Sequence, residues 1–189
     1  MYGHFRVWQR TYWLGIPAMK IPLDFWVYQE IMWETRPQFI IETGTRDGGS
    51  ALFFASICDL IGEGRVITID VDDLASRTLS HPRITTIVGD SVSDDVISQV
   101  RRIVGNQTAM VSLDSDHSKG HVLREMELYS EFVSLGNYLV VEDTALRGPG
   151  PGRAVKEFLR HRKDFVPDRT REKFLYTGFP GGFLKRIRD

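Results

Sequence analysis

Residues 39–50 constrain the fold of this chain most strongly, because they join an apolar strand, a glycine turn and a helix start. The apolar run 39–41 ends in Glu42, glycines follow at Gly44, Gly48 and Gly49, and Ser50 opens a helix-compatible run. This order is typical of a parallel α/β sheet, in which ligands bind beyond the carboxyl ends of the strands. The glycines allow the backbone to approach a ligand where a Cβ would clash.

The acid before the glycines indicates what kind of ligand binds. The pattern is E-x-G-x-x-x-G-G and differs from the G-x-G-x-x-G of dinucleotide-binding enzymes. A carboxylate at Glu42 would repel a pyrophosphate. It would suit a cationic or amine-bearing ligand, such as the amino-acid end of S-adenosylmethionine.

Strands alternate with helices along the rest of the chain. We expect parallel strands at 39–41, 65–70, 83–88, 109–114 and 138–143, with helices at 50–57, 94–104, 121–132 and 153–160. Residues 173–176 and 182–187 predict two last strands in an antiparallel hairpin. The predicted fold class is therefore α/β: a Rossmann-like, doubly wound, mostly parallel seven-stranded sheet with an antiparallel C-terminal hairpin.

A chain of 189 residues fits one domain. Residues 1–36 are rich in aromatic side chains and predict a helical N-terminal segment that belongs to the same domain as the sheet of residues 37–189. A helix is expected at 23–35, between Pro22 and Pro37, and a loop at 13–17. The aromatics are interpreted as packing on the sheet, with a substrate lid or a homo-oligomer contact as alternatives.

Net charge, cysteine content and the lack of long apolar runs indicate the compartment and the kinds of partner to expect. The net charge of −1 gives no indication of nucleic-acid binding. The single cysteine, Cys58, cannot form an internal disulfide and indicates a reducing compartment. The N-terminus lacks the apolar core of a signal peptide, and no run of residues is long enough to span a membrane. We therefore expect a cytoplasmic protein.

Acidic residues close four of the expected strands. They are Glu42, Asp70, Asp114 and the pair Glu142 and Asp143. Because parallel strands end at one edge of the sheet, these acids should converge there. A carboxylate after the second strand can accept both hydroxyls of a ribose, and this is the role expected for Asp70. The alternative for Asp70 is a solvated turn acid, since two more aspartates follow it.

Asp114, Glu142 and Asp143 come from neighbouring strands and would repel one another unless a cation joins them. Oxygen ligands of this kind suit Mg²⁺ or Mn²⁺. Helix capping is the alternative for one or two of these acids. His117, in the next loop, is a candidate general base or metal-adjacent ligand, and a plain surface role stays open.

Several motifs together resemble the cephalosporin hydroxylase / rhamnosyl O-methyltransferase family, whose members are class I S-adenosylmethionine-dependent methyltransferases. The motifs are E-T-G-T-R-D-G-G-S at 42–50, D-S-D-H-S at 114–118 and V-E-D-T at 141–144. Residues 12–17, 22–26, 171–175 and 180–182 also match patterns of this family. The resemblance covers nearly the whole chain and implies the class I methyltransferase fold.

The resemblance implies a role for each candidate site residue. The methionine part of the cofactor would be held by Glu42 and the loop residues Gly44, Thr45, Arg46, Gly48 and Ser50. Asp70 would bind the ribose, Asp90 and Ser91 would lie near the adenine, and Asp114 would border the cofactor. The metal triad of catechol-type O-methyltransferases falls on Asp114, Glu142 and Asp143. The lysine base of those enzymes falls on His117, with Lys119 nearby.

The expected function is therefore metal-assisted O-methyl transfer from S-adenosylmethionine to a hydroxyl of a sugar or small natural product, with Mg²⁺ or Mn²⁺. A nucleotide-dependent oxidoreductase is a rival, against which the missing G-x-G-x-x-G counts. A non-catalytic module that binds S-adenosylmethionine is another rival, because fold alone does not establish catalysis. The expected partner is a small hydroxylated acceptor, with no nucleic acid and no membrane.

Overall fold

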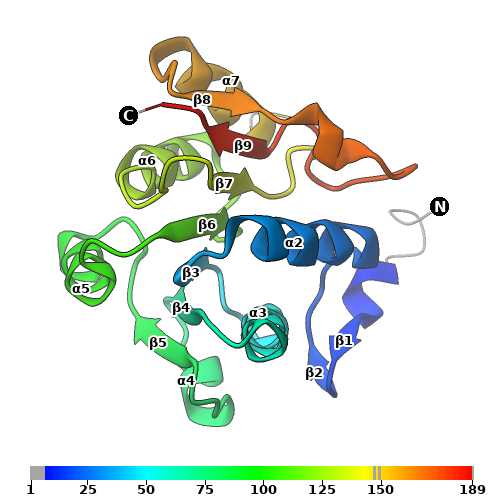
Figure 1. Ribbon diagram of the computed structural model, residues 1–189, viewed down its shortest axis with the longest axis vertical. Helices are drawn as coiled ribbons and strands as arrows, with labels where there is room; N and C mark the ends of the chain where they lie inside the picture. The colour runs from blue at the N-terminus through cyan, green and yellow to red at the C-terminus, as the bar shows by residue number, and fades with distance from the viewer. Residues whose placement is uncertain (1–6, 147, 149, 189) are drawn as a thin grey trace.

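The computed structural model describes residues 7–146, 148 and 150–188. Its centre is a seven-stranded sheet in the order β5-β4-β3-β6-β7-β9-β8, which runs through the middle of Figure 1. The five parallel strands are β3 (Phe39–Thr43), β4 (Arg65–Asp70), β5 (Ile84–Val88), β6 (Ala109–Leu113) and β7 (Tyr138–Val141). The predicted α/β fold with a mostly parallel, seven-stranded sheet is confirmed.

Strand β3 lies at the centre of the sheet, between β4 and β6. All five of its residues are buried, in keeping with an apolar strand covered on both faces. Thr43 pairs with Ile69 of β4 on one side and with Leu113 of β6 on the other. The chain therefore leaves the sheet at the same level after each of these strands. The strand order reverses at this point, which is where α/β sheets bind their ligands.

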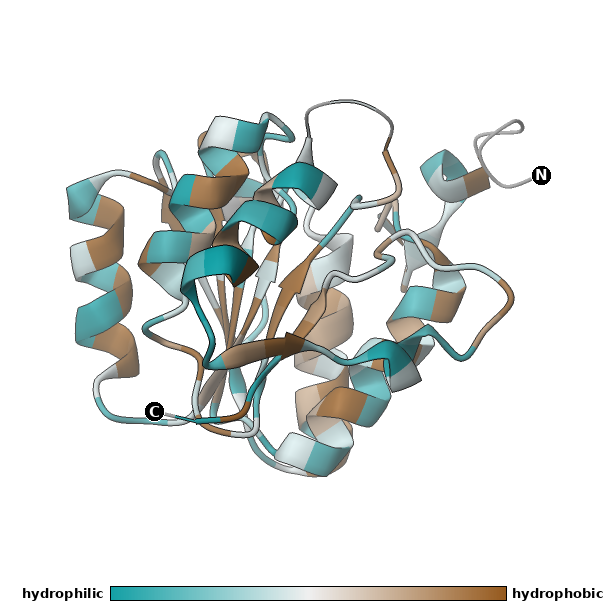
Figure 2. Cartoon of the chain, turned by 90° about the horizontal axis from the view of Figure 1, so that it is seen from above, coloured by the Kyte–Doolittle hydropathy of each residue, from teal (hydrophilic) through white to brown (hydrophobic). Residues whose placement is uncertain are grey.

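Helices cover both faces of the sheet (Figure 1). On one face α2 (Pro22–Thr35) and α3 (Gly49–Ile61) pack into one apolar cluster, and on the other α5 (Asp94–Val104), α6 (Lys119–Tyr129) and α7 (Pro151–His161) pack into a second. Figure 2 shows the hydrophobic strands between these helices. A short helix, α4 (Leu74–Thr78), was not predicted. Within the described part of the chain, no helix combines the length and apolar composition needed to cross a membrane.

The N-terminal segment adds a small hairpin to the outside of α3. A 3-10 helix, η1 (Val7–Arg10), leads into β1 (Tyr12–Trp13) and β2 (Ile16–Pro17), which pair antiparallel. The sequence predicted a loop at 13–17, and only its two central residues, with positive φ, form the turn. The Trp13 indole donates to Ser56 of α3 at 3.0 Å. The first six residues of the predicted segment lie outside the described residues.

The C-terminal edge corrects one strand prediction. β9 (Phe183–Arg186) forms as expected, but it pairs antiparallel with β7 and with β8 (Phe165–Pro167). The strand expected at 173–176 is wrong. The Asp168 side chain accepts the Thr170 amide at 3.1 Å and starts a 3-10 helix, η2 (Arg169–Glu172). The ion pair of Arg171 with Glu34 then holds this segment against α2.

Candidate active site

The loops at the carboxyl edge of the sheet enclose a cavity of about 850 Å³, a volume that suits a small-molecule ligand. Three of the predicted site residues, Glu42, Gly48 and Lys119, are not part of its lining. The other predicted site residues line the cavity together: Gly44, Thr45, Arg46, Ser50, Asp70, Asp90, Ser91, Asp114, His117, Glu142 and Asp143.

Gly44 brings the end of β3 against the end of β6. Its φ of 87° lies in the left-handed region, and a Cβ at this position would overlap the main-chain carbonyl of Asp114. Its amide donates to the carbonyl of Ile69 at 2.8 Å, which fixes the turn to β4 as well. The turn closes at Gly48, with a φ of 91°, directly before α3. Glycine at position 44 is thus required by the contact between two strand ends.

Glu42 lies beneath this turn with no exposed surface. Its Oε2 accepts a hydrogen bond from Thr68 Oγ1 at 2.6 Å, whereas its Oε1 has no hydrogen-bond partner among the described residues. Burial raises the pKa of the Glu42 carboxyl, and the charge of Lys20 opposes that shift. A buried carboxylate oxygen without a partner suits an ammonium group on a bound ligand.

Asp70 and Asp90 line the other part of the cavity. The Asp70 carboxylate accepts the amides of Arg46 at 2.7 Å and Asp72 at 3.0 Å, so the glycine loop fixes its orientation. The Asp90 carboxylate accepts the Val92 amide at 3.1 Å. Each of these carboxylates still has lone pairs available for ligand hydroxyls or amines.

A buried glutamate, Glu125, supports this part of the cavity and was missed by sequence reasoning. Its Oε1 accepts hydrogen bonds from Ser91 at 2.6 Å and Ser115 at 2.7 Å. His121, which lines the cavity, lies 3.5 Å from the same oxygen, and this contact raises the pKa of the imidazole. Because Glu125 is inside α6, only the helical spacing from His121 could have indicated it.

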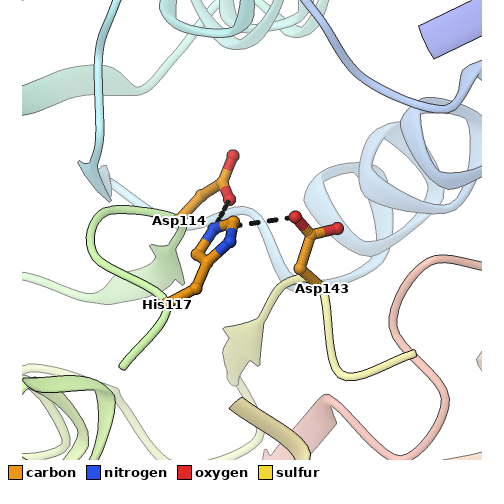
Figure 3. Close-up of side chains that lie close together, drawn as sticks. All are labelled: Asp114, His117 and Asp143. Carbon is orange, nitrogen blue, oxygen red and sulfur yellow. Dashed lines mark hydrogen bonds and ion pairs between the residues drawn. The ribbon is translucent and has the colours of Figure 1, made fainter. Parts of the chain in front are cut away.

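The side chains of Asp114, His117 and Asp143 lie close together beyond the carboxyl ends of β6 and β7, where they point toward one another (Figure 3). His117 Nε2 lies 3.2 Å from Asp114 Oδ1 and 3.6 Å from Asp143 Oδ2. One ligand atom from each lies within 4.8 Å of the others, close enough to share a metal ion. The hydrogen bond to Asp114 raises the pKa of His117, although burial opposes the shift. Burial raises the pKa of Asp143.

Glu142 points away from this group, into the core. Its Oε1 accepts the Tyr28 hydroxyl at 2.8 Å and the Ser112 hydroxyl at 3.0 Å, and its Oε2 lies 2.8 Å from the ammonium of Lys20. Burial raises the pKa of Glu142, and Lys20 counteracts this. The structure therefore brings Asp114 and Asp143 together with His117, while Lys20 lies between Asp114 and the third predicted ligand, Glu142.

Lys20 is the main site residue that sequence reasoning missed. It lies between β2 and α2, is 6% exposed, and contacts both Asp114 and Glu142. Burial alone would lower the pKa of its ammonium, but the two carboxylates raise it above the ordinary value. In the sequence it is a single lysine just before the helix of residues 22–35. Nothing in that position indicates contacts with acids 94 and 122 residues further along the chain.

Lys119, the other predicted base, is the first residue of α6. Its ammonium pairs with Glu157 on α7 at 2.5 Å. The structure does not bring Lys119 to the cavity, so His117 is the candidate base that lies with the carboxylates.

Comparisons with known proteins support one family. The family model described as Rhamnosyl O-methyltransferase/CmcI matches residues 5–187. A rhamnosyl O-methyltransferase of Mycobacterium bovis is 38% identical over 200 residues, covering 98% of this chain and 81% of that protein. A rhamnosyl O-methyltransferase of Mycobacterium leprae is 39% identical over 202 residues, covering 98% and 86%.

A solved structure described as "cmcI-D160 Mg-SAM" aligns with a TM-score of 0.75 at 23% identity, covering 95% of this chain and 78% of that one. This likeness confirms the class I methyltransferase fold expected from the motifs. The predicted enzyme class, an S-adenosylmethionine-dependent O-methyltransferase, is confirmed by the family match and the curated relatives. The chain belongs to the rhamnosyl O-methyltransferase/CmcI family.

Proposed function

We propose that this protein methylates a hydroxyl of a sugar, a rhamnosyl unit in the first instance, with the assistance of a divalent metal ion. The position of Asp114 carries the proposal, because its backbone touches the glycine loop while its carboxylate faces His117. A cofactor on the loop and an acceptor at the carboxylates would then be neighbours in one cavity. The mycobacterial relatives are rhamnosyl O-methyltransferases by name, which supports a sugar acceptor.

The cofactor would lie along the cavity from the glycine loop to α6. The loop at Gly44 would border the methionine part, and Glu42, buried beneath that loop, would supply the counter-charge for its ammonium from behind the lining. Asp70 would accept the ribose hydroxyls, and Asp90 and Ser91 would border the adenine. The cofactor supplies a methyl group already activated as a sulfonium, so no covalent enzyme intermediate is needed.

The acidic end of the cavity would hold Mg²⁺ or Mn²⁺. Asp114 and Asp143 offer oxygens on either side of one point, and Glu142 would join them if its carboxylate left Lys20. Carboxylate oxygens fit these hard ions. A divalent ion there would orient two neighbouring oxygens of a sugar and lower the pKa of the reacting hydroxyl.

His117 would remove the proton. In the metal-free arrangement its Nε2–H donates to Asp114, so Nε2 would be able to accept a proton only when a bound cation takes over the Asp114 oxygen. A hydroxyl bound beside the two aspartates would then lie within reach of this nitrogen. The acceptor oxygen, freed of its proton, would be placed to take the methyl group from the sulfonium of the cofactor, which would leave as the neutral thioether. Alignment of the two reactants is the main contribution of the protein, and it can be worth about 7–11 kcal/mol.

Incubation of the purified protein with S-adenosylmethionine, Mg²⁺ and a panel of small glycosides tests the proposal. The panel should contain rhamnosides with a free vicinal diol and matched deoxy analogues. We expect a product heavier by one methylene from the diol-bearing rhamnosides only, together with S-adenosylhomocysteine. Absence of transfer to every acceptor, with the cofactor bound, would favour a non-catalytic module.

A further inference from the structure

We propose that Lys20 is a built-in counter-ion of the acidic cluster, which holds Asp114 and Glu142 together in the metal-free protein and competes with a divalent ion for the same oxygens. The inference rests on the metal site of the proposed function. It assigns a role to a residue outside the motifs that carry the cofactor and the metal. Lys20 is therefore a positioning residue, since it acts on the reaction through the two acids.

The contacts place the ammonium between two strand ends. Nζ of Lys20 contacts Asp114, which follows β6, and lies 2.8 Å from Oε2 of Glu142, which follows β7. The side chains of Lys20 and Glu142 are only 6% and 2% exposed. Oε1 of Glu142 is already held by Tyr28 and Ser112, so an ion that bridged the two acids would need the Oε2 that the ammonium now contacts. The two cations would therefore compete for that oxygen, and their charges would repel each other beside Asp114.

Contacts of the N-terminal segment fix the position of Lys20. Thr11 Oγ1 accepts the Lys20 amide at 3.0 Å, and the same oxygen lies 2.9 Å from the Trp8 carbonyl and 3.0 Å from the Lys20 carbonyl, so Thr11 ties the Lys20 backbone to the N-terminal segment. Met19, just before it, has a φ of 53°, a strained conformation for a residue with a side chain. A Cβ on Gly49 at the start of α3 would overlap the backbone of Pro17, which shows how tightly this loop is seated.

Lys20 does not neutralise all of the negative charge around it. Besides Asp114 and Glu142, three further carboxylates interact with the charge of Lys20: those of Glu42, Asp143 and Asp24. One ammonium therefore faces several acids, and a divalent ion still finds a negative site. Without the lysine, Glu142 would be left as an uncompensated buried charge and Asp114 would keep only His117 as a partner, which is destabilising until another cation binds.

Two substitutions separate charge from length. Lys20→Met keeps an unbranched stem and removes the charge, and Lys20→Arg keeps the charge as the matched control. Calorimetry would measure Mn²⁺ affinity of the full chain without S-adenosylmethionine, and urea unfolding would be followed with chelator and with saturating Mn²⁺. We expect Lys20→Met to bind Mn²⁺ at least about tenfold more tightly than the wild type. We also expect it to lose stability in chelator and regain it with Mn²⁺, while Lys20→Arg stays close to the wild type.

Unchanged or weaker Mn²⁺ binding by Lys20→Met, with binding by the wild type, would overturn the inference and leave the metal site intact. Binding by neither protein would overturn the metal site itself. Binding by Lys20→Met alone would support the inference most strongly. If Lys20→Met does not fold in chelator, Thr11→Val is the second variant, because it keeps the charge of Lys20 and removes the hydroxyl that holds its backbone. A Mn²⁺ affinity of Thr11→Val equal to that of the wild type would count against the inference.

Discussion

Gly44→Ala tests the contact that joins the cofactor loop to the acidic cluster. Two costs add at this position. A φ of 87° is unfavourable for a residue with a Cβ by about 1–2 kcal/mol. The new Cβ would also overlap the main-chain carbonyl of Asp114, and relief of such overpacking costs about 1–3 kcal/mol. We therefore expect a loss of about 2–5 kcal/mol in the free energy of unfolding.

Gly62→Ala is the matched control, because Gly62 has a φ of 91° and no described atom lies within 4 Å of the position its Cβ would take. It should lose only the backbone cost of about 1–2 kcal/mol. For a chain of this length, about 2–4 °C of melting temperature is expected per kcal/mol. Thermal unfolding followed by circular dichroism measures both variants. Equal losses in the two variants would refute the claim that Gly44 seats β3 against Asp114.

Three further predictions concern the cavity and the buried residues that support it. His117→Gln should lower kcat by about 10²-fold or more. In the wild type, kcat/KM should fall as the pH drops through the raised pKa of His117, because the protonated imidazole cannot accept a proton. A pH–rate profile of both proteins checks this. Glu42→Gln should weaken S-adenosylmethionine binding by about tenfold or more in calorimetry, since the amide loses the charge that faces the ammonium. Asp24→Ala should lower the free energy of unfolding in urea by about 1–3 kcal/mol, because Thr177 Oγ1 and the Gly178 amide lose their buried acceptor.

The parallel half of the fold could be predicted from the sequence because its signals are local. The runs 39–41 and 109–113 are each followed by an acid, and such a run is typical of a buried parallel strand. The C-terminal edge could not be predicted in the same way. Residues 173–176 have strand-forming side chains, but Asp168 and the distant Glu34 hold the preceding segment in a 3-10 helix.

The residues of the candidate site likewise differ in whether a local sequence signal indicates them. Asp70, Asp114 and Asp143 could be found because each lies at the carboxyl end of a strand, and parallel strands end at one edge of the sheet. Lys20 and Glu125 could not, since each reaches the site through tertiary contacts with segments far away in the chain. The direction of Glu142 was likewise beyond the sequence, because Tyr28 on α2 draws its carboxylate inward.

Methyl transfer at graded Mg²⁺ concentrations tests the central claim most directly. The rate of methylation of a rhamnoside would be measured for the wild type and for Asp143→Asn, with chelator as the zero point. We predict a rate that rises from near zero to saturation in the wild type, and a higher half-saturating Mg²⁺ concentration in Asp143→Asn, because one ligand oxygen is replaced by a neutral amide. A full rate in chelator, equal in the two proteins, would contradict metal-assisted transfer at this site.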